Sequence, residues 1–378
     1  MTAFSPIQVE EAPSASRLPR MPLAVALGLT LLITIARLTG TVDSDVAWQL
    51  WIAGRIHAGA NLYTDIIETN PPLWFWIAVP VDRLAAVLHV RVEAALVGTM
   101  GVLVALALAA TDRLIGHISL GRRALLLGYA ALTLAVMPWM HVGQREQIVL
   151  IGTVPYAALI AARRTGERVS PQLAALVGIG AALGFALKHY FLVIPASLEL
   201  WLIAGAARRW RPLRAETCAI VCTGLAYAAA MVLFEGDFVT RIVPLLQLAY
   251  GAFGAPSIRY LFGPFAVIGM LTLTLVATQR RMLASGRAPF AAALAVAGAA
   301  FAAVYFIQFK GWLYHSIPML GCGSLALAAI LAETRPTPLL RLLAPATLAL
   351  PPTRPPISSS TPARRCATSA PAASPIAS

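Results

Sequence analysis

The feature that most constrains this chain is a succession of long apolar stretches separated by short polar loops. The stretches recur every 20 to 35 residues or so, about the spacing of helices that cross a hydrocarbon core roughly 30 Å thick. Only 12% of the 378 residues are charged, whereas soluble domains have about 25%. The chain therefore has too little polar surface to fold in water, and we expect an all-α, polytopic membrane bundle.

Ten of the stretches are predicted to span the membrane: Met21–Leu38, Ala94–Ala110, Ala124–Trp139, Ile148–Ala162, Leu173–Leu187, Tyr190–Ala207, Thr217–Phe234, Leu261–Thr278, Pro289–Phe309 and Ile317–Leu331. An eleventh, Pro72–Val90, contains Asp82 and Arg83. A charge at the bilayer centre costs at least about 2.5–3.5 kcal/mol, so we expect this stretch to be a broken or re-entrant helix. The bundle would then have about ten or eleven transmembrane helices.

The distribution of arginine predicts the orientation of the bundle. With the N-terminus inside and ten crossings, the arginine-rich loops at 113–123, 163–168, 208–214 and 280–287 all lie inside. One net crossing by Pro72–Val90 would move all of them outside. We therefore expect a multi-pass protein of the plasma (inner) membrane with both termini cytoplasmic. This distribution explains the net charge of +13 better than nucleic-acid binding does.

The two ends of the chain differ from its centre. Residues 1–20 are expected to form a cytoplasmic tail, and residues 21–332 the transmembrane domain, with the first outer loop at 39–72. Residues 333–378 are rich in Pro, Ala, Ser and Thr and cannot bury an apolar core. We expect that segment to be a disordered tail.

The first outer loop contains two carboxylates, Asp43 and Asp45, directly after the first span. Ser44 or Asp45 is a suitable N-cap for a helix over residues 46–58, which Gly59 would end. Tryptophan favours the membrane interface, so we expect this helix to lie flat on the membrane surface. The side chains predicted to share one side of it are Trp48, Trp51 and Ile52.

Further along the loop, Gly59-Ala60-Asn61-Leu62-Tyr63-Thr64-Asp65 precedes Asn70-Pro71-Pro72. With the acidic pair and the interfacial helix, these segments resemble the GT-C glycosyltransferases. The closer likeness is to the protein-mannosyltransferase, aminoarabinose-transferase and Rgt-like branch. The likeness covers residues from about 20 to 330, and its most specific part is 39–76. The resemblance implies a sugar donor carried on a polyprenyl phosphate and used at the outer membrane face.

The resemblance also implies roles for residues of this loop. It places a catalytic acid here, which gives the general-base role to Asp43 or Asp45. Asp43 is slightly favoured because it is closer to the first span, but many relatives carry Asp-Glu here and the choice stays open. The Asp-x-Asp spacing is also compatible with a divalent metal, the one cofactor considered. The loop residues expected to support the acceptor or the sugar are Tyr63, Glu68 and Asn70.

Glycosyl transfer from a lipid phosphate also needs cations that hold the departing phosphate. Lys188 and Lys310 are the only lysines, and both fall in outer turns, whereas the inner loops use arginine. Arg145 lies in the outer loop 140–147 and can bind phosphate in a bidentate manner. The alternatives are lysines that snorkel at helix ends and a local pair of Arg145 with its neighbour. Further supporting residues are expected to be Glu146, Trp312 and His315.

These features together predict an inverting glycosyltransferase that uses a polyprenyl-phosphate sugar on a glycan, lipid or protein acceptor of the cell envelope. Sequence patterns of Rossmann, P-loop, nucleophile-elbow and zinc enzymes are absent. A transporter or flippase is the main alternative, although the charges gather at one face and no internal repeat is visible. A non-catalytic membrane subunit of the GT-C type is the other alternative.

Overall fold

The structure is a computed structural model that describes residues 21–206, 210–252 and 258–334. Fourteen α-helices and a few short 3-10 or π turns make up this part of the chain, which contains no β-strand. The helices are α1 (Met21–Arg37), α2 (Ser44–His57), α3 (Leu73–Leu88), α4 (Val92–Leu114), α5 (Leu120–Ala135), α6 (Arg145–Thr165), α7 (Pro171–Phe185), α8 (Val193–Ala206), α9 (Ala215–Phe234), α10 (Val243–Ala252), α11 (Pro264–Thr278), α12 (Arg280–Ala284), α13 (Pro289–Gln308) and α14 (Ile317–Glu333).

Six helices within the described residues are long and apolar enough to cross a membrane. They are α4, α6, α9 and α13, together with α8 and α14 when the 3-10 turns that precede these two are included. Shorter apolar helices are α1, α7, α11 and the segment Phe238–Leu248. The predicted all-helical class is therefore confirmed, and the chain is a multi-pass membrane protein. Each predicted span overlaps a helix, while the number of crossings and their direction stay predictions.

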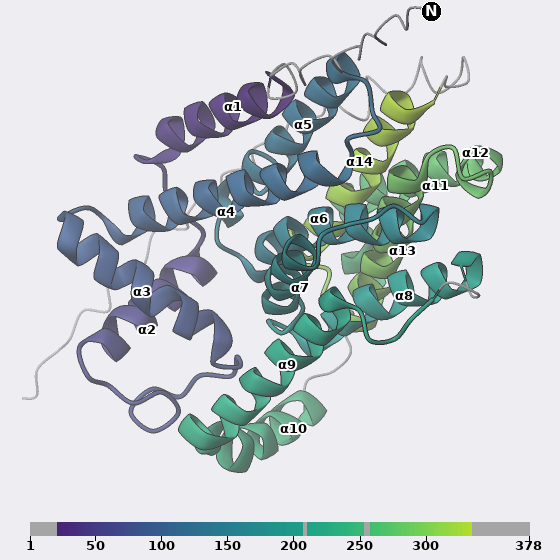
Figure 1. The fold of residues 1–378 in the computed structure, drawn as a ribbon. Coiled ribbons are helices and arrows are strands. Elements are labelled where there is room, and N and C mark those ends of the chain that lie inside the picture. Colours follow the sequence, from purple (N-terminus) through teal and green to yellow (C-terminus); the bar gives the residue numbers. More distant parts are fainter. Residues whose placement is uncertain (1–20, 207–209, 253–257, 335–378) are drawn as a thin grey trace, which may run out of the picture.

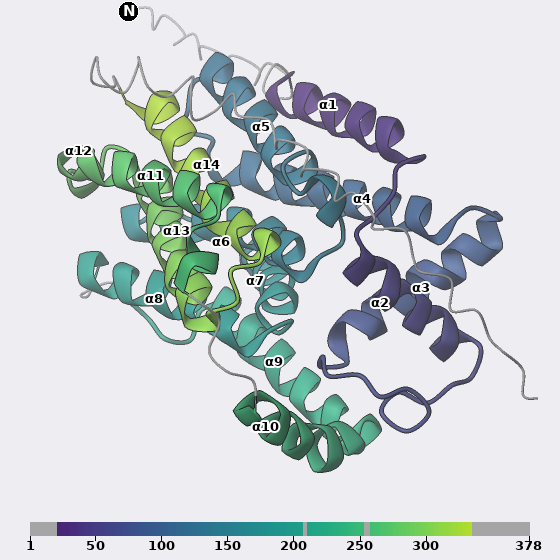
Figure 2. The same ribbon diagram turned by 180° about the vertical axis from the view of Figure 1, so that it is seen from behind.

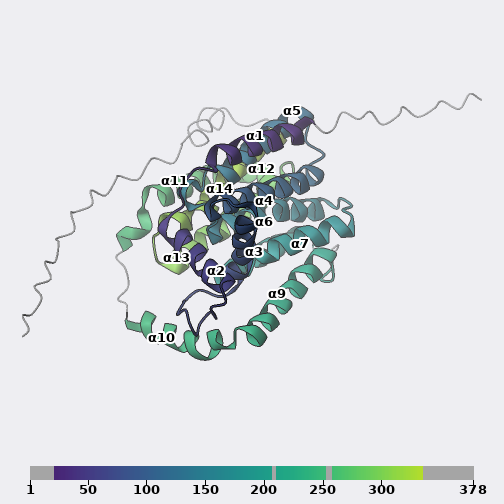
Figure 3. The ribbon, with the colours of Figure 1, turned by 90° about the vertical axis from the view of Figure 1, so that its left-hand side faces the viewer.

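Helix α6 is the centre of the bundle. It packs against α4, α7, α8, α13 and α14, which surround it in Figure 1. From behind, α11, α13 and α14 lie side by side along one flank (Figure 2). The protein buries 83% of the apolar window of α6 but none of that of α9, at 0%. Helix α9 packs on α7 and extends with α10 away from the other helices (Figure 3), so its apolar side chains suit contact with lipid.

Glycine lets α6 and α7 pack closely. A Cβ atom added to Gly152 of α6 would lie 2.9 Å from the carbonyl oxygen of Gly180. One added to Gly184 of α7 would lie 2.9 Å from the Cα of Val149. Small residues at such a crossing allow the two backbones to make extensive van der Waals contact, which is the main attraction between helices in lipid.

Helix α2 begins at Ser44, two residues earlier than the predicted start at Val46. Its N-cap is Asp43, whose side chain accepts a hydrogen bond from the amide of Val46 at 2.9 Å. The prediction of Ser44 or Asp45 as the cap was wrong, because it is the carboxylate of Asp43 that reaches a free amide of the first turn. The helix ends at His57, just before Gly59, whose φ is +99°.

The two tryptophans of α2 are exposed, as the sequence suggested. Trp48 and Trp51 are 50% and 52% exposed, and their rings stack with centroids 4.9 Å apart. Ile52 is fully buried, so it does not share their side of the helix. That part of the prediction was wrong because Ile52 packs into the core instead.

The stretch Pro72–Val90 forms the single helix α3, with Pro80 in its interior. The expected break is therefore wrong. The carboxylate of Asp82 lies 2.6 Å from Nδ1 of His57 on α2, so a polar partner rather than a break in the helix accommodates it. Helices α2 and α3 pack together beside α4. The absence of a net crossing here stays a prediction.

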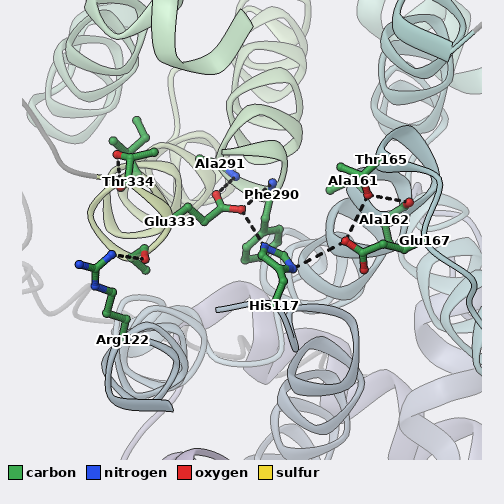
Figure 4. A network of polar contacts seen from close by, with 12 residues as sticks. His117, Arg122, Ala161, Ala162, Thr165, Glu167, Phe290, Ala291, Glu333 and Thr334 are labelled. Carbon is green, nitrogen blue, oxygen red and sulfur yellow. Dashed lines mark hydrogen bonds and ion pairs between the residues drawn. The ribbon is translucent and has the colours of Figure 1, made fainter. Parts of the chain in front are cut away.

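A network of polar contacts joins helix ends at one end of the bundle (Figure 4). Glu333, at the end of α14, accepts hydrogen bonds from the amides of Phe290 (3.2 Å) and Ala291 (3.0 Å) in the first turn of α13. Nε2 of His117 lies 3.3 Å from the same carboxylate, and Nδ1 lies 3.8 Å from Glu167. The hydrogen bond to Glu333 raises the pKa of His117, although burial opposes the shift. Glu333 thus satisfies amides that the helix itself leaves unpaired.

Both predicted tails lie outside the described residues, apart from Glu333 and Thr334 at the start of the second.

Candidate functional site

The loops that the sequence places on the outer side meet at the end of the bundle opposite the His117–Glu333 network. The backbone amide of Asp43 donates to the carbonyl of Met140 at 2.9 Å, and the hydroxyl of Tyr314 donates to Asp45 at 2.9 Å. Helices of about 20 residues, such as α6 and α13, separate the two ends by roughly 30 Å. The loops that converge are 39–72, 140–147, the turn at 188 and 310–316.

An open pocket of about 240 Å³ lies where loops 39–72, 140–147 and 310–316 meet. Trp312, which is 50% exposed, is one of its walls. The side chains that line it are Asp43, Ser44, Asp45, His141, Trp312 and Tyr314. Carboxylate, imidazole, hydroxyl and aromatic groups therefore surround one small space.

Asp43 has partners on both carboxylate oxygens. Oδ1 accepts from the amide of Val46, while Oδ2 is in close hydrogen-bond contact with Nδ1 of His141 and lies 3.5 Å from Nε2 of Gln144. Burial alone would raise the pKa of Asp43, but the hydrogen bonds from His141 and Val46 hold it below its ordinary value. Asp43 is therefore an ionised group that both caps α2 and holds an imidazole ring.

Asp45 is in a different environment, although it is only two residues away. Its Oδ2 accepts a hydrogen bond from Tyr314, a contact that joins residues 269 positions apart in sequence. Its Oδ1 makes no hydrogen bond to any residue in the described part of the chain. Asp45 thus retains acceptor capacity beside the pocket.

A buried ion pair lies behind Tyr314. Nζ of Lys188 is 2.6 Å from Oε1 of Glu146, 3.4 Å from Oε1 of Gln308 and 3.3 Å from Nε2 of His315. The side chains of Lys188 and Glu146 are 14% and 1% exposed. Burial lowers the pKa of Lys188, and the carboxylate of Glu146 opposes that shift. Nζ also lies 5.8 Å from the ring of Tyr314, so the pair contacts the wall of the pocket.

Arg145 belongs to a third group, centred on Asn70. Its guanidinium donates to Oδ1 of Asn70, and the carbonyl of Asn70 accepts from the hydroxyl of Tyr63 at 2.7 Å. Oε1 of Glu68 accepts from the side-chain amide of Asn70 at 2.8 Å, and Oε2 accepts from Nε1 of Trp48 at 3.0 Å. This group fixes the entry to α3 against the start of α6 and against α2.

Lys310 lies near the rim of the pocket. Its Nζ is 5.2 Å from the ring centroid of Trp312, whose ring stacks on that of His315 at 5.5 Å. The charge of Lys310 also contributes to lowering the pKa of Lys188, so the two ammonium groups are near each other. The chain's two lysines thus belong to one end of the bundle.

Unusual backbone conformations accompany these loops. Tyr63, Trp139 and Phe309 have positive φ values of 71°, 49° and 49°. Bulky side chains rarely adopt this region, and such strain persists only where the surrounding structure enforces it, as at many functional sites.

The predicted site residues therefore form three neighbouring groups. The pocket contains Asp43, Asp45 and Trp312; the buried pair contains Lys188, Glu146 and His315, with Lys310 nearby; and the entry to α3 contains Arg145, Asn70, Glu68 and Tyr63. Glu146 has Lys188, not the adjacent Arg145, as its ion-pair partner.

Sequence reasoning gave no role to three residues that hold the site together. His141 and Tyr314 contact the two aspartates, and Gln147 accepts from the amide of Gly143 at 2.7 Å and donates to the carbonyl of Leu134 at 2.9 Å. The available signal was that His141 and Tyr314 are hydrogen-bonding side chains in outer loops. Nothing in the sequence pairs them with particular carboxylates.

The carboxylates of the Asp-x-Asp triplet are engaged mainly in hydrogen bonds. Both oxygens of Asp43 accept hydrogen bonds, and Oδ2 of Asp45 accepts one from Tyr314. No group of three or more His, Cys, Asp or Glu side chains that could hold a metal ion occurs among the described residues. The possible divalent metal at Asp43 and Asp45 stays a prediction.

The fold and the site together define a multi-pass helical membrane protein with a polar pocket at one end of the bundle. Comparison with known protein families, with curated proteins and with solved structures found no match to this chain.

Proposed function

We propose that this protein is a membrane glycosyltransferase of the GT-C type, of the branch that includes protein-mannosyltransferases and aminoarabinose transferases. It takes a sugar from a polyprenyl phosphate and transfers it, with inversion, to a hydroxyl group of a cell-envelope glycan, lipid or protein. The supporting observation is the open pocket that has two carboxylates, Asp43 and Asp45, in its wall and three cationic residues near it.

The carboxylates can provide the basic group that takes the proton of the acceptor hydroxyl. As the acceptor oxygen bonds to the anomeric carbon, its proton must pass to a nearby basic group. Asp45, and Asp43 with its imidazole partner, are the polar groups of the pocket that accept protons. In an inverting transfer the acceptor attacks from the face opposite the departing phosphate, so both substrates must reach this pocket.

The cations can stabilise the negative charge of the departing phosphate. The bond between the anomeric carbon and the phosphate oxygen breaks, and its electron pair leaves with the polyprenyl phosphate. Lys310, beside Trp312 at the rim, is the cation assigned to direct contact with that phosphate. Lys188 and Arg145, which are held by Glu146 and Asn70, add positive potential behind the pocket and favour the developing charge.

The exposed tryptophans support a position at the membrane surface. Trp48 and Trp51 are on the helix that Asp43 caps, and tryptophan is enriched at the level of lipid headgroups. A pocket at that depth is within reach of a phosphate whose lipid tail lies in the bilayer. We place this surface on the outer side of the plasma membrane because the arginine-rich loops would then be cytoplasmic.

The test is transfer of radiolabelled sugar from a polyprenyl phosphate by the protein in liposomes, with envelope extract as the acceptor. Asp43→Asn and Asp45→Asn are expected to lower the rate by about 10²- to 10⁴-fold, the usual contribution of acid–base catalysis. Lys310→Ala is expected to lower it less. Asp237→Asn, at a half-exposed acid paired with Arg241, is the matched control and should keep the wild-type rate.

Unchanged transfer in both Asp43→Asn and Asp45→Asn contradicts the proposal. Movement of a solute or lipid across the vesicle without transfer identifies the protein as a transporter or flippase instead. Absence of both activities identifies a non-catalytic subunit.

A further inference from the structure

His141 forms a hydrogen bond with Asp43 in the pocket, and the proposed function assigns no step to its imidazole ring. Nδ1 of this ring is in close hydrogen-bond contact with Oδ2 of Asp43. The ring centroid lies 5.5 Å from that of Tyr314, which is bound to Asp45. The imidazole thus lies beside Asp43 and next to Tyr314, in the wall of the pocket.

The contact with Asp43 determines where the proton of the ring resides. An ionised carboxylate only accepts hydrogen bonds, so the nitrogen that contacts it, Nδ1, must be the one that bears hydrogen. Neutral histidine then carries its basic lone pair on Nε2. Nε2 of His141 makes no hydrogen bond to any residue in the described part of the chain, so that lone pair is available to a substrate.

Asp43 is itself poorly arranged to take a proton. Val46, His141 and Gln144 occupy its two oxygens, and its amide is bound to the carbonyl of Met140 at 2.9 Å. These contacts fix the carboxylate between α2 and loop 140–147 and favour its ionised form. Such a group orients an imidazole and stabilises the imidazolium that forms, as a buried aspartate does in hydrolases with a histidine base.

We propose that His141 is the proton acceptor of this site and that Asp43 is the residue that positions it. The inference rests on the proposed glycosyl transfer. The acceptor hydroxyl gives its proton to Nε2 of His141 as its oxygen bonds to the anomeric carbon. The bond from that carbon to the phosphate breaks, and the electron pair leaves with the phosphate. The imidazolium, stabilised by Asp43, then loses its proton to water, which restores the starting state.

The experiment compares variants of His141 in the liposome transfer assay. His141→Ala is expected to lower kcat by about 10²- to 10⁴-fold with little change in KM, and added imidazole is expected to restore at least part of the rate. His141→Asn keeps an amide donor near the position of Nδ1 but lacks Nε2, so it should be inactive although Asp43 keeps its partner. His189→Ala, at an exposed histidine of a neighbouring loop, is the control and should keep the wild-type rate.

Asp43→Asn tests the positioning role separately. Asparagine is as good an N-cap as aspartate, so α2 should stay intact. Its amide group offers an N–H to the ring and favours the wrong tautomer, so kcat should fall while KM stays within about twofold of wild type. The melting temperature of each variant in the same lipid shows that the protein is folded.

The possible outcomes separate this inference from the proposed function. If His141→Asn retains more than a third of the wild-type rate while Asp43→Asn is inactive, Asp43 is the base and the inference is wrong. Failure of imidazole to restore any activity to folded His141→Ala also overturns it. Both results leave the glycosyltransferase itself intact, whereas a wild-type protein that transfers no sugar removes the proposed function and the inference together.

Discussion

Buried carboxylates lie at both ends of the helical bundle, but they are bonded differently at the two ends. At the end shown in Figure 4, Glu333 accepts hydrogen bonds on both oxygens. At the same end, Glu216 accepts from Arg163 on Oε1 at 2.9 Å and on Oε2 at 3.0 Å. At the pocket end, Glu146 is paired only through Oε1, and its Oε2 is buried without a hydrogen-bond partner among the described residues.

Among these three glutamates, only Glu146 has a buried oxygen without a hydrogen-bond partner in the described residues, and we infer that this oxygen is a functional contact. Buried polar atoms are nearly always paired, so one that is not usually marks a place where a ligand or water completes the arrangement. Nδ1 of His315, beside Glu146, is also buried and without a partner in the described part of the chain. We therefore expect changes at the pocket end to affect activity and stability, and changes at the other end to affect stability alone.

The largest effect is expected from breaking the buried ion pairs. Lys188→Met leaves the buried carboxylate of Glu146 without its lysine partner, which should destabilise the protein by about 3–5 kcal/mol. The double variant Lys188→Met, Glu146→Gln should recover most of the stability but not sugar transfer. At the other end, Arg163→Met, Glu216→Gln also removes the ion pair of Glu216 with Arg214, so it should keep sugar transfer but recover only part of the stability. Melting temperatures and transfer rates in the same liposomes measure this, and a pocket-end double variant with wild-type transfer contradicts the comparison.

A change midway between the two ends should affect stability and activity together. Gly152→Ala places a methyl group 2.9 Å from a backbone oxygen of α7 and is expected to cost about 1–3 kcal/mol. Gly180→Ala is the matched control, because nothing lies within 4 Å of the added methyl group. Chemical denaturation in lipid–detergent micelles gives the stability of each. Equal losses in the two variants would show that close helix packing is not the cause.

A smaller effect is expected at the end in Figure 4. Glu333→Gln removes the negative charge that faces the first turn of α13, which should cost about 1 kcal/mol. Transfer by the folded protein should not change. A rate that falls more than the folded fraction does would mean that this end also contributes to function.

The smallest effect is a dependence of stability on pH through His117. Its pKa in the folded protein is raised above the ordinary 6.5, so its contribution is fully present below pH 6.5 and is lost as the pH rises through the raised value. Because the side chain is 38% exposed, solvent screening limits the contribution to less than about 1 kcal/mol. The difference in melting temperature between wild type and His117→Asn should therefore shrink from about pH 6 to about pH 9. A difference in melting temperature that grows with pH would contradict this prediction.

The sequence by itself determined the class of protein and which loops carry polar groups. Hydropathy is a local property of the chain, so the apolar runs identified every predicted span as helical. The same reasoning placed the two aspartates and both lysines in loops on one side. The three loops that carry these residues do meet, together with loop 140–147, at one end of the bundle.

Only the tertiary structure decided which of these residues are partners. Asp45 and Tyr314 are 269 positions apart, and Lys188 and Glu146 are 42 apart, because α6 is packed between helices from distant parts of the chain. The hydrophobic periodicity of the sequence does not reveal which of these residues are partners. The same holds for the cap at Asp43, the burial of Ile52 and the continuity of α3, since each depends on what the rest of the fold places beside it. The sequence determined the side of the membrane protein on which the polar residues gather, and packing decided that Asp43 faces His141.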